Sequence, residues 1–271
     1  MPDSSAAFVG SIPANYDRHL GPLLFHQYAD DLVERLVVRP GMRVLETACG
    51  TGIVTRRLVK HLGPDAALVA TDLNQAMIDH ARTQVAPNSM IEWIAADATS
   101  LPFGDRSFDA VVCQFGLMFY PDKAAGVAEA FRVLTPGGVH LFNVWYAIEH
   151  NEVARIADET VTAFFPDDPP RFYAVPYGFY DRNLIRSLLI DAGFERVDLD
   201  VVDKVGVSPS AADAATGYIE GNPMLNEILN RRPEALAEIK ATLAHNIATR
   251  LGDHPVRSPL RAIVVTAHRS V

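Results

Sequence analysis

Short apolar runs alternate with amphipathic stretches along the chain from about residue 43 onwards. The apolar runs have the length and composition of strands that a sheet buries on both faces, and they lie at 43–49, 67–73, 90–97, 108–115 and 136–145. The stretches between them repeat apolar residues at helical spacing, at 53–62, 74–85 and 123–134. Strands that alternate with helices predict βαβ units, right-handed crossovers and a mostly parallel sheet. We therefore expect an α/β fold with a doubly wound, Rossmann-like sheet.

The regular alternation ends after residue 146, and the remaining elements are more varied. The same periodicities predict helices at about 13–38 and at 181–194, a strand at 196–207, a mainly helical stretch at 211–250 and a last strand at 261–269. Residues 147–180 contain EVARIADETVTAFF and then a loop-like stretch. Asp181 is the predicted N-cap of the helix at 181–194, and Gly193 marks its end. These parts lie outside the alternating core, so we expect them to cover a binding site.

A small-residue turn follows the first predicted strand, in the stretch VLETACGTG at 44–52. Gly50 and Gly52 permit a tight turn and a close approach to a ligand, because they have no Cβ. The helix that follows offers unpaired N–H groups. A P-loop is excluded, because no Lys-Ser/Thr pair follows the glycines. The dinucleotide fingerprint G-x-G-x-x-G/A is incomplete, because Thr55 occupies its last position.

Three carboxylates are placed at the ends of the first three predicted strands. Glu46 lies in the first and would favour a cationic ligand over a pyrophosphate. Asp72 ends the second, at the distance from the glycines where an acid accepts hydrogen bonds from ribose hydroxyls. Asp97 ends the third and can accept a hydrogen bond from an adenine amino group. Together with the glycines, these acids predict a nucleotide-type site, although a ribose contact does not separate dinucleotides from other nucleosides.

Four stretches between about residues 40 and 146 carry a family resemblance. They are VLETACGTG, ATDLNQAMIDHAR, ADATSLPFGDRSFDAVVCQFGLMFYPD and RVLTPGGVHLFNVW. The chain resembles the class I S-adenosylmethionine-dependent methyltransferases, in particular the small-molecule branch that includes quinone-biosynthesis C-methyltransferases. The segment YDRHLGPLLF, at 16–25, is similar to the opening helix of that family. The resemblance implies a seven-stranded sheet whose last strand is antiparallel, with helical lid elements.

The resemblance also implies S-adenosylmethionine as the cofactor, with contacts from the strand ends and the opening helix. The expected contacts are Tyr16, Glu46, Thr47, Ala48, Gly50, Gly52 and Gln114 near the methionine part, and Asp72, Leu73, Asp97 and Ala98 around the adenosine. The implied segments are an N-terminal helical cap (1–40), a cofactor-binding α/β core (41–146), an insertion or lid (147–180), a core continuation (181–207), a helical lid (208–258) and a final core strand (259–271).

Aromatic residues beyond the fourth and fifth strands predict an apolar pocket for the methyl acceptor. The expected pocket residues are Phe119, Tyr120, Trp145, Tyr146 and Tyr177, and further aromatic candidates are Phe115, Tyr173, Phe179 and Tyr180. Methyl transfer needs a base only if the nucleophile must lose a proton. Of the candidates His19, His26 and His150, the last is best placed, because it follows the fifth strand. Quinone-type members often carry paired histidines where this chain has the segment 115–120, so the acceptor stays open.

Composition narrows the classes of partner. The formal net charge of −9 argues against nucleic acid, which usually meets a basic face. The segment DPPRF, at 168–172, is similar to a motif of amino-methylating DNA enzymes, but Arg171 occupies its aromatic position and the segment follows the wrong strand. No cluster of Cys and His has the spacing of a zinc site, and the two cysteines are expected to be buried thiols. We therefore expect no metal.

Hydropathy bears on location. No apolar run approaches the roughly 18 residues that span a bilayer, and the first ten residues do not read as a signal peptide. We expect a cytoplasmic protein without a membrane partner. The predicted function is methyl transfer to an O, C or N atom of a small, apolar or aromatic molecule. Two alternatives stay open, an NAD(P)-dependent dehydrogenase and a non-catalytic scaffold that binds S-adenosylmethionine.

Overall fold

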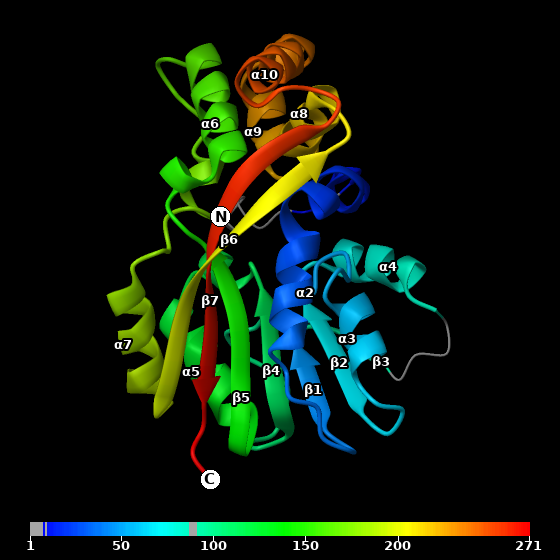
Figure 1. The fold of residues 1–271 in the computed structure, drawn as a ribbon, viewed down its shortest axis with the longest axis vertical. Helices are drawn as coiled ribbons and strands as arrows, with labels where there is room; N and C mark the ends of the chain where they lie inside the picture. The colour runs from blue at the N-terminus through cyan, green and yellow to red at the C-terminus, as the bar shows by residue number, and fades with distance from the viewer. Residues whose placement is uncertain (1–7, 9, 87–90) are drawn as a thin grey trace.

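A seven-stranded sheet forms the centre of the molecule, in a computed structural model that describes residues 8, 10–86 and 91–271 (Figure 1). Its strands follow the order β3-β2-β1-β4-β5-β7-β6. They are β1 (Arg43–Glu46), β2 (Ala67–Asp72), β3 (Ile91–Ala95), β4 (Phe108–Gln114), β5 (Leu134–Trp145), β6 (Arg196–Ser208) and β7 (Val256–His268). Only β7 runs antiparallel to its neighbours, β5 and β6. The predicted seven-stranded sheet with an antiparallel last strand is therefore confirmed.

The strand order of the sheet reverses between the parallel strands β1 and β4, which lie side by side in its middle. From β1 the chain passes outwards through α3 (Thr55–His61), β2 and α4 (Gln75–Gln84) to β3. From β4 it passes the other way through α5 (Lys123–Val133) to β5. Right-handed crossovers in opposite directions place α5 on the face opposite α3 and α4 (Figure 1). The carboxyl ends of β1 and β4 therefore border the crevice where such sheets bind ligands.

Positive φ angles end the central strands earlier than the sequence predicts. The first was expected to reach residue 49, but β1 stops at Glu46, and Ala48 and Gly50 have φ of 51° and 55°. The fourth was expected to reach residue 115, but Phe115 itself has a φ of 50°. An apolar run can continue through a turn that no longer has strand geometry, so hydrophobicity alone overestimates these strands. The third prediction began at residue 90, which lies outside the described residues.

The N-terminal segment was predicted as one helix over 13–38, and it consists of three pieces. They are α1 (Ile12–Asn15), the π-helical stretch η2 (Tyr16–Phe25) and α2 (His26–Glu34). Pro22 lies inside η2, where its missing N–H removes a helical hydrogen bond. The amide of His26 instead donates to the carbonyl of Gly21, one residue further back than in an α-helix. We call residues 10–34 of this segment the cap; the first seven residues of the predicted cap lie outside the described part.

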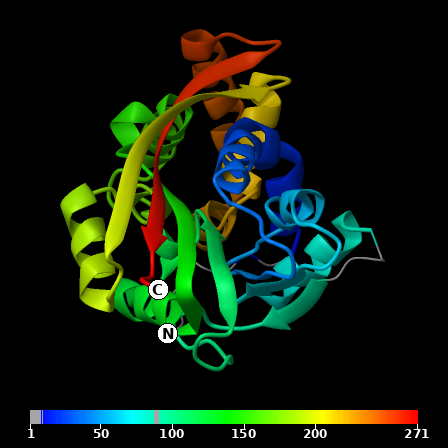
Figure 2. The ribbon, with the colours of Figure 1, turned by 60° about the horizontal axis from the view of Figure 1, so that its bottom comes forward.

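Strands β6 and β7 continue past the rest of the sheet and carry a group of helices above its carboxyl edge (Figure 1). The helices are α6 (Glu152–Phe164), α8 (Ala211–Glu220), α9 (Met224–Arg231) and α10 (Leu236–Leu251). We call α8 to α10 the lid, and Figure 2 shows its helices beside the cap. The last strand starts at Val256 instead of the expected 261, because Pro259 and polar neighbours hide the strand pattern. None of the described helices combines the length and apolar character needed to cross a membrane.

The remaining helical elements pack around the sheet or connect its strands. They are α7 (Arg182–Ala192) and the short turns η3 (Leu117–Phe119), η4 (Ile148–His150), η5 (Phe172–Ala174) and η6 (Pro233–Ala235). The predicted caps of α7 are confirmed. The side chain of Asp181 accepts a hydrogen bond from the amide of Asn183, and Gly193 closes the helix with a φ of 108°.

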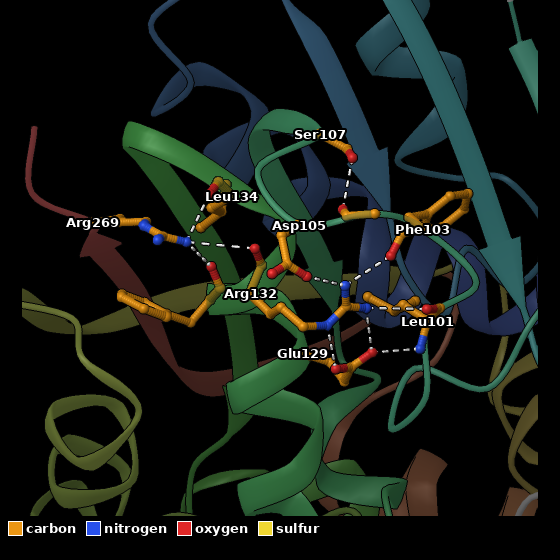
Figure 3. A network of polar contacts seen from close by, with 10 residues as sticks. Leu101, Phe103, Asp105, Ser107, Glu129, Arg132, Leu134 and Arg269 are labelled. Atoms are coloured by element: carbon orange, nitrogen blue, oxygen red, sulfur yellow. Dashed lines mark hydrogen bonds and ion pairs between the residues drawn. The ribbon is translucent and has the colours of Figure 1, made fainter.

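A polar network fixes the long connection between β3 and β4 (Figure 3). The Arg132 guanidinium, on α5, donates to the carbonyls of Leu101 and Phe103 and to the carboxylate of Asp105. Glu129 binds the same guanidinium and accepts from the amide of Leu101. These bonds hold the connection against α5, and so position the chain that follows the end of β3.

Candidate functional site

The glycine-rich loop after β1 is held by backbone hydrogen bonds. The amide of Cys49 donates to the carbonyl of Thr71 at 2.9 Å, and the amide of Gly52 donates to the carbonyl of Cys49 at 2.9 Å. Gly52 has a φ of +79°, and a Cβ built on it would lie 3.1 Å from the Cβ of Ala81 on α4. Glycine is therefore required here both by the backbone angle and by the close packing of α4.

Asp72 ends β2 with a carboxylate that the loop holds in a fixed orientation. One oxygen accepts from the amide of Gly50 and the other from the amide of Asn74, each at 2.8 Å. The side chain is buried, and burial raises its pKa, which the hydrogen bonds from Asn74 and Gly50 partly offset. Each carboxylate oxygen can accept more than one hydrogen bond. The group therefore keeps acceptor capacity for a pair of hydroxyls.

Glu46 ends β1 as a buried carboxyl group, 2% exposed. Its Oε2 accepts from the Thr55 hydroxyl at 2.6 Å. Burial is the main cause that raises its pKa to about 8, and the bond from Thr55 opposes the shift. A carboxyl in this state prefers its neutral form near pH 7 unless a cation lies beside it.

A small cavity of about 20 Å³ joins the loop, Glu46 and the cap. Its lining residues are Tyr16, Glu46, Ala48, Cys49, Gly50, Thr51, Ile53, Val54 and Gln114. The side-chain Oε1 of Gln114 is buried and has no hydrogen-bond partner among the described residues. Two acceptor groups, from Glu46 and Gln114, thus belong to one cavity, and none of its described lining residues is a cation. Both groups can accept hydrogen bonds, and the ammonium group of S-adenosylmethionine is a donor that fits them. We call this space the cofactor cavity.

The residues expected around the adenosine lie apart from this cavity, on the open side of the sheet edge. Leu73 follows Asp72 and is 61% exposed. Asp97 is exposed, and its carboxylate accepts from the amide and the hydroxyl of Thr99. Ala98 lines a separate small cavity together with Thr47. These residues lie at the ends of adjacent strands β2 and β3, where an adenosine could be bound outside the sheet.

An aromatic cavity of about 60 Å³ lies beside the cofactor cavity. Its lining comes from residue 8, the cap, the segment from the end of β4 through η3, the end of β5, the segment around η5, and the lid. The lining residues are Phe8, Tyr16, Leu20, Leu24, Phe25, Phe115, Met118, Phe119, Trp145, Phe172, Tyr173, Pro176, Tyr177, Tyr218 and Asn222. The rings of Phe115 and Trp145 stack at 3.9 Å, and those of Tyr16 and Phe25 at 4.7 Å. Tyr16 lines both cavities. Gln114 lines the cofactor cavity, and the next residue, Phe115, lines the aromatic cavity, so the two cavities adjoin.

Three of the five predicted acceptor residues, Phe119, Trp145 and Tyr177, line the aromatic cavity, and two do not. Tyr120 points elsewhere, since its hydroxyl donates to the hydroxyl of Thr47 at 3.3 Å. Tyr146 directly follows β5, and its amide continues the pairing with β7 by donating to the carbonyl of Arg261 at 3.0 Å. Its side chain lies in an open groove with Tyr180. Successive side chains of a strand point to opposite faces, so Trp145 and Tyr146 could not both face one cavity. Of the further candidates, Phe115 and Tyr173 line the cavity, whereas Phe179 and Tyr180 do not.

None of the three candidate histidines lines the aromatic cavity. His150 is exposed, and its Nδ1 lies 3.2 Å from the Arg261 guanidinium. His19 pairs with Asp213 of the lid at 3.3 Å. His26 is partly buried near Arg57, and burial lowers its pKa. The structure therefore gives no support to His150 as a base, because it places the imidazole away from both cavities.

Several lining residues were not predicted from the sequence. They are Phe8, Leu20, Leu24, Phe25, Met118, Phe172, Pro176, Tyr218 and Asn222. Four of them follow residue 170, where the family resemblance has no motif. Three lie in the segment 16–25, where the resemblance predicts an opening helix but does not say which side chains meet the acceptor. A helical repeat of apolar residues indicates that a face is buried but not what it is buried against.

One acidic residue ties the cap to the glycine-rich loop. The carboxylate of Asp17 accepts from the Arg56 guanidinium at 2.8 Å and from the Thr51 hydroxyl at 3.1 Å. His80 Nε2 lies 3.8 Å from the same carboxylate. We call Asp17 and its partners the cap clamp. Because Asp17 follows Tyr16 directly, the clamp holds the residue that covers the cofactor cavity.

Comparisons with known proteins place these observations in a family context. A sequence family described as "Methyltransferase domain" matches residues 44–138. The ubiquinone/menaquinone biosynthesis C-methyltransferase UbiE of Ectopseudomonas mendocina (strain ymp) is 32% identical over an alignment of 178 positions, which covers 61% of this chain and 70% of that protein. The UbiE of Shewanella frigidimarina (strain NCIMB 400) is 30% identical over an alignment of 179 positions, which covers 61% of this chain and 71% of that protein.

The fold also matches solved structures. A phosphoethanolamine N-methyltransferase 2 of Haemonchus contortus, in complex with S-adenosyl-L-methionine, aligns with a TM-score of 0.61 at 15% identity, over 96% of this chain and 57% of that one. At such identities the likeness concerns the fold alone. It agrees with the seven-stranded sheet described above.

Proposed function

The chain belongs to the class I S-adenosylmethionine-dependent methyltransferases, and from this premise we propose that its acceptor is a small, uncharged, apolar or aromatic molecule held in the aromatic cavity. The methyl group would pass to an O, C or N atom of that molecule. The relatives named above act in quinone biosynthesis by their names, and this chain is 30–32% identical to them over 61% of its own length.

The observation that best supports this acceptor class is that the aromatic cavity adjoins the cofactor cavity and has an uncharged wall. Among its described lining residues there is no Asp, Glu, Lys, Arg or His. An ammonium, carboxylate or phosphate on the acceptor would lose its hydration there without gaining a partner. Stacked rings such as Phe115 and Trp145 instead offer flat apolar surfaces. The wall therefore supports a neutral acceptor.

S-adenosylmethionine supplies a methyl group that its sulfonium already activates. On this proposal Glu46 and Gln114 bind the methionine part, and Asp72 binds the ribose hydroxyls. Tyr16 and Phe115, at the junction of the cavities, exclude water and align the acceptor with the methyl group. Holding two reactants in line is a large source of rate for a displacement of this kind. The burial that raises the pKa of Tyr16 and of Tyr177 disfavours either phenol as a base, so the proposed role of the wall is positioning.

Calorimetry with the full chain tests the cofactor assignment. We expect S-adenosylmethionine and S-adenosylhomocysteine to bind and NADH not to bind. Asp72→Ala should weaken the binding of both sulfur compounds by about 10- to 100-fold, which is the contribution of hydrogen bonds to a charged group. Asp79→Ala is the matched control, because Asp79 lies exposed on α4, bonded to Gln75, and outside both cavities.

Two outcomes would favour the alternatives. Binding of NADH, with none of the sulfonium compound, would support the dehydrogenase. Binding of S-adenosylmethionine without methyl transfer to any neutral aromatic acceptor, in assays with a tritiated methyl donor, would support the non-catalytic scaffold.

A further inference from the structure

The hydroxyl of Tyr218 is a buried polar group without a hydrogen bond. Tyr218 lies on α8 of the lid, is 2% exposed, and lines the aromatic cavity. Within the described part of the chain, its Oη has no partner with hydrogen-bond geometry. Buried polar groups in folded proteins are nearly always paired, because an unpaired one loses its bonds to water and gains nothing. This hydroxyl therefore needs an explanation.

Two other polar side chains of the same wall, those of Tyr173 and Asn222, are already bonded. The Tyr173 hydroxyl donates to the carbonyl of Tyr218 at 2.7 Å. The Asn222 side chain donates to that carbonyl at 2.9 Å and accepts from the amide of Met224 at 2.9 Å. These bonds fix the end of α8 and leave the Tyr218 hydroxyl as the unsatisfied group.

The Tyr177 hydroxyl is the polar neighbour of this group. The proximity of Tyr177 contributes, after burial, to the raised pKa of Tyr218. The pKa of each phenol responds to the other hydroxyl as a hydrogen-bonding neighbour, but among the described residues their contact does not reach the geometry of a full hydrogen bond. Two adjacent hydroxyls on an otherwise apolar wall can bind one further oxygen between them.

We propose that the Tyr218 hydroxyl, with that of Tyr177 beside it, binds an oxygen of the methyl acceptor, and that the enzyme thereby selects neutral aromatic molecules that carry a hydroxyl or carbonyl group. This inference rests on the proposed function, because it assigns the polar contact of the acceptor in the aromatic cavity. Sites that bind a polar group in this way reject analogues without it, because the protein group is then left unpaired.

A matched pair of small ligands tests this selectivity. 4-Methylphenol and 1,4-dimethylbenzene differ only by a hydroxyl in place of a methyl group. Their binding is measured by calorimetry in saturating S-adenosylhomocysteine, to the wild type, Tyr218→Phe and Tyr173→Phe. We expect the wild type to prefer the phenol by about tenfold, the worth of one hydrogen bond. Tyr218→Phe should abolish the preference, and Tyr173→Phe should keep it, because that hydroxyl is already bonded elsewhere.

Thermal unfolding without ligand gives a second readout. Tyr218→Phe should leave the Tm unchanged or raise it, because no bond is lost, whereas Tyr173→Phe should lower it. A fall in Tm for Tyr218→Phe as large as that for Tyr173→Phe would show that the hydroxyl has a structural role with Tyr177, and would overturn the proposal.

The binding data can also overturn the proposal. They would do so if the wild type did not prefer 4-methylphenol over 1,4-dimethylbenzene, or if Tyr218→Phe kept that preference. If S-adenosylhomocysteine binds but neither aromatic ligand does, the cavity assignment fails while the methyltransferase assignment stands. If S-adenosylhomocysteine itself does not bind, the cofactor assignment fails first.

Discussion

Glu46 shows how a single buried carboxyl couples ligand binding to pH. Its raised pKa, about 8, means that the folded protein binds this proton more tightly than the unfolded chain, whose glutamate has a pKa near 4.5. The free energy of unfolding of the free protein should therefore fall as the pH rises from about 4.5 to about 8. A bound ammonium would reverse the preference of the carboxyl, so that ligand binding would release the proton.

The affinity for S-adenosylhomocysteine should accordingly rise with pH. Between pH 6 and about 8 we expect the Kd to fall by up to about tenfold per pH unit, the limit for one released proton, and then to level off. Glu46→Gln should bind more weakly at pH 8 and show no such slope. Calorimetry across this range checks the prediction, and a flat profile for the wild type would contradict it.

The cap is an element whose position depends on a few polar contacts. The π-helical stretch η2 places Tyr16 over the cofactor cavity, and the bonds of Asp17 to Arg56 and Thr51 hold that end of the stretch. These side chains are only partly exposed, so solvent screens the ion pair less than a pair on the open surface. The cap clamp should therefore slow the release of a bound cofactor.

Weakening the clamp should increase the dissociation rate of S-adenosylhomocysteine. We expect Asp17→Asn to raise this rate by about 5- to 30-fold in stopped-flow displacement, because one charge-assisted bond is lost. Asp31→Asn is the control, since it breaks an ion pair with Arg35 on the same cap, away from the loop. Equal rates in the wild type and Asp17→Asn would refute the role of the clamp.

The acceptor site as a whole exists only where three distant parts of the chain meet. The cap, the ends of β4 and β5, and the lid each contribute walls to a cavity of about 60 Å³. Pockets for small molecules usually measure about 300–1,000 Å³. The aromatic cavity is therefore too small for a typical acceptor, and the cap and the lid must separate for one to enter.

Hydrogen exchange should record this opening. Amides of η2 and α8 are expected to exchange faster than those of β1 and β4 in the free protein, and to slow when S-adenosylhomocysteine and 4-methylphenol are added together. Amides of the central strands should change little. Equal protection of cap and core in the free protein would contradict a separable cap.

Local rules explain how much of the protein could be predicted. Glu46, Gly50 and Asp72 each lie where an apolar strand gives way to a turn, and parallel strands bring such ends to one edge. The sheet, its antiparallel last strand and the placing of Glu46 and Gln114 around one cavity follow from patterns within short segments and from the family resemblance. Side-chain alternation also requires Trp145 and Tyr146 to face opposite ways, but the sequence alone does not say which of them meets the acceptor.

Other features were decided by tertiary structure alone. Phe25 and Tyr218 line one cavity although almost two hundred positions separate them, and no sequence pattern assigned either of them to the acceptor. His150 follows the end of β5 as predicted, yet the turn there directs it to Arg261 instead of the cavity. The sequence by itself determined which residues lie at the edge of the sheet that carries the cofactor cavity, because each strand end encodes its own turn. The acceptor wall was decided only when the cap and the lid packed together, because long-range packing depends on surfaces that no local pattern specifies.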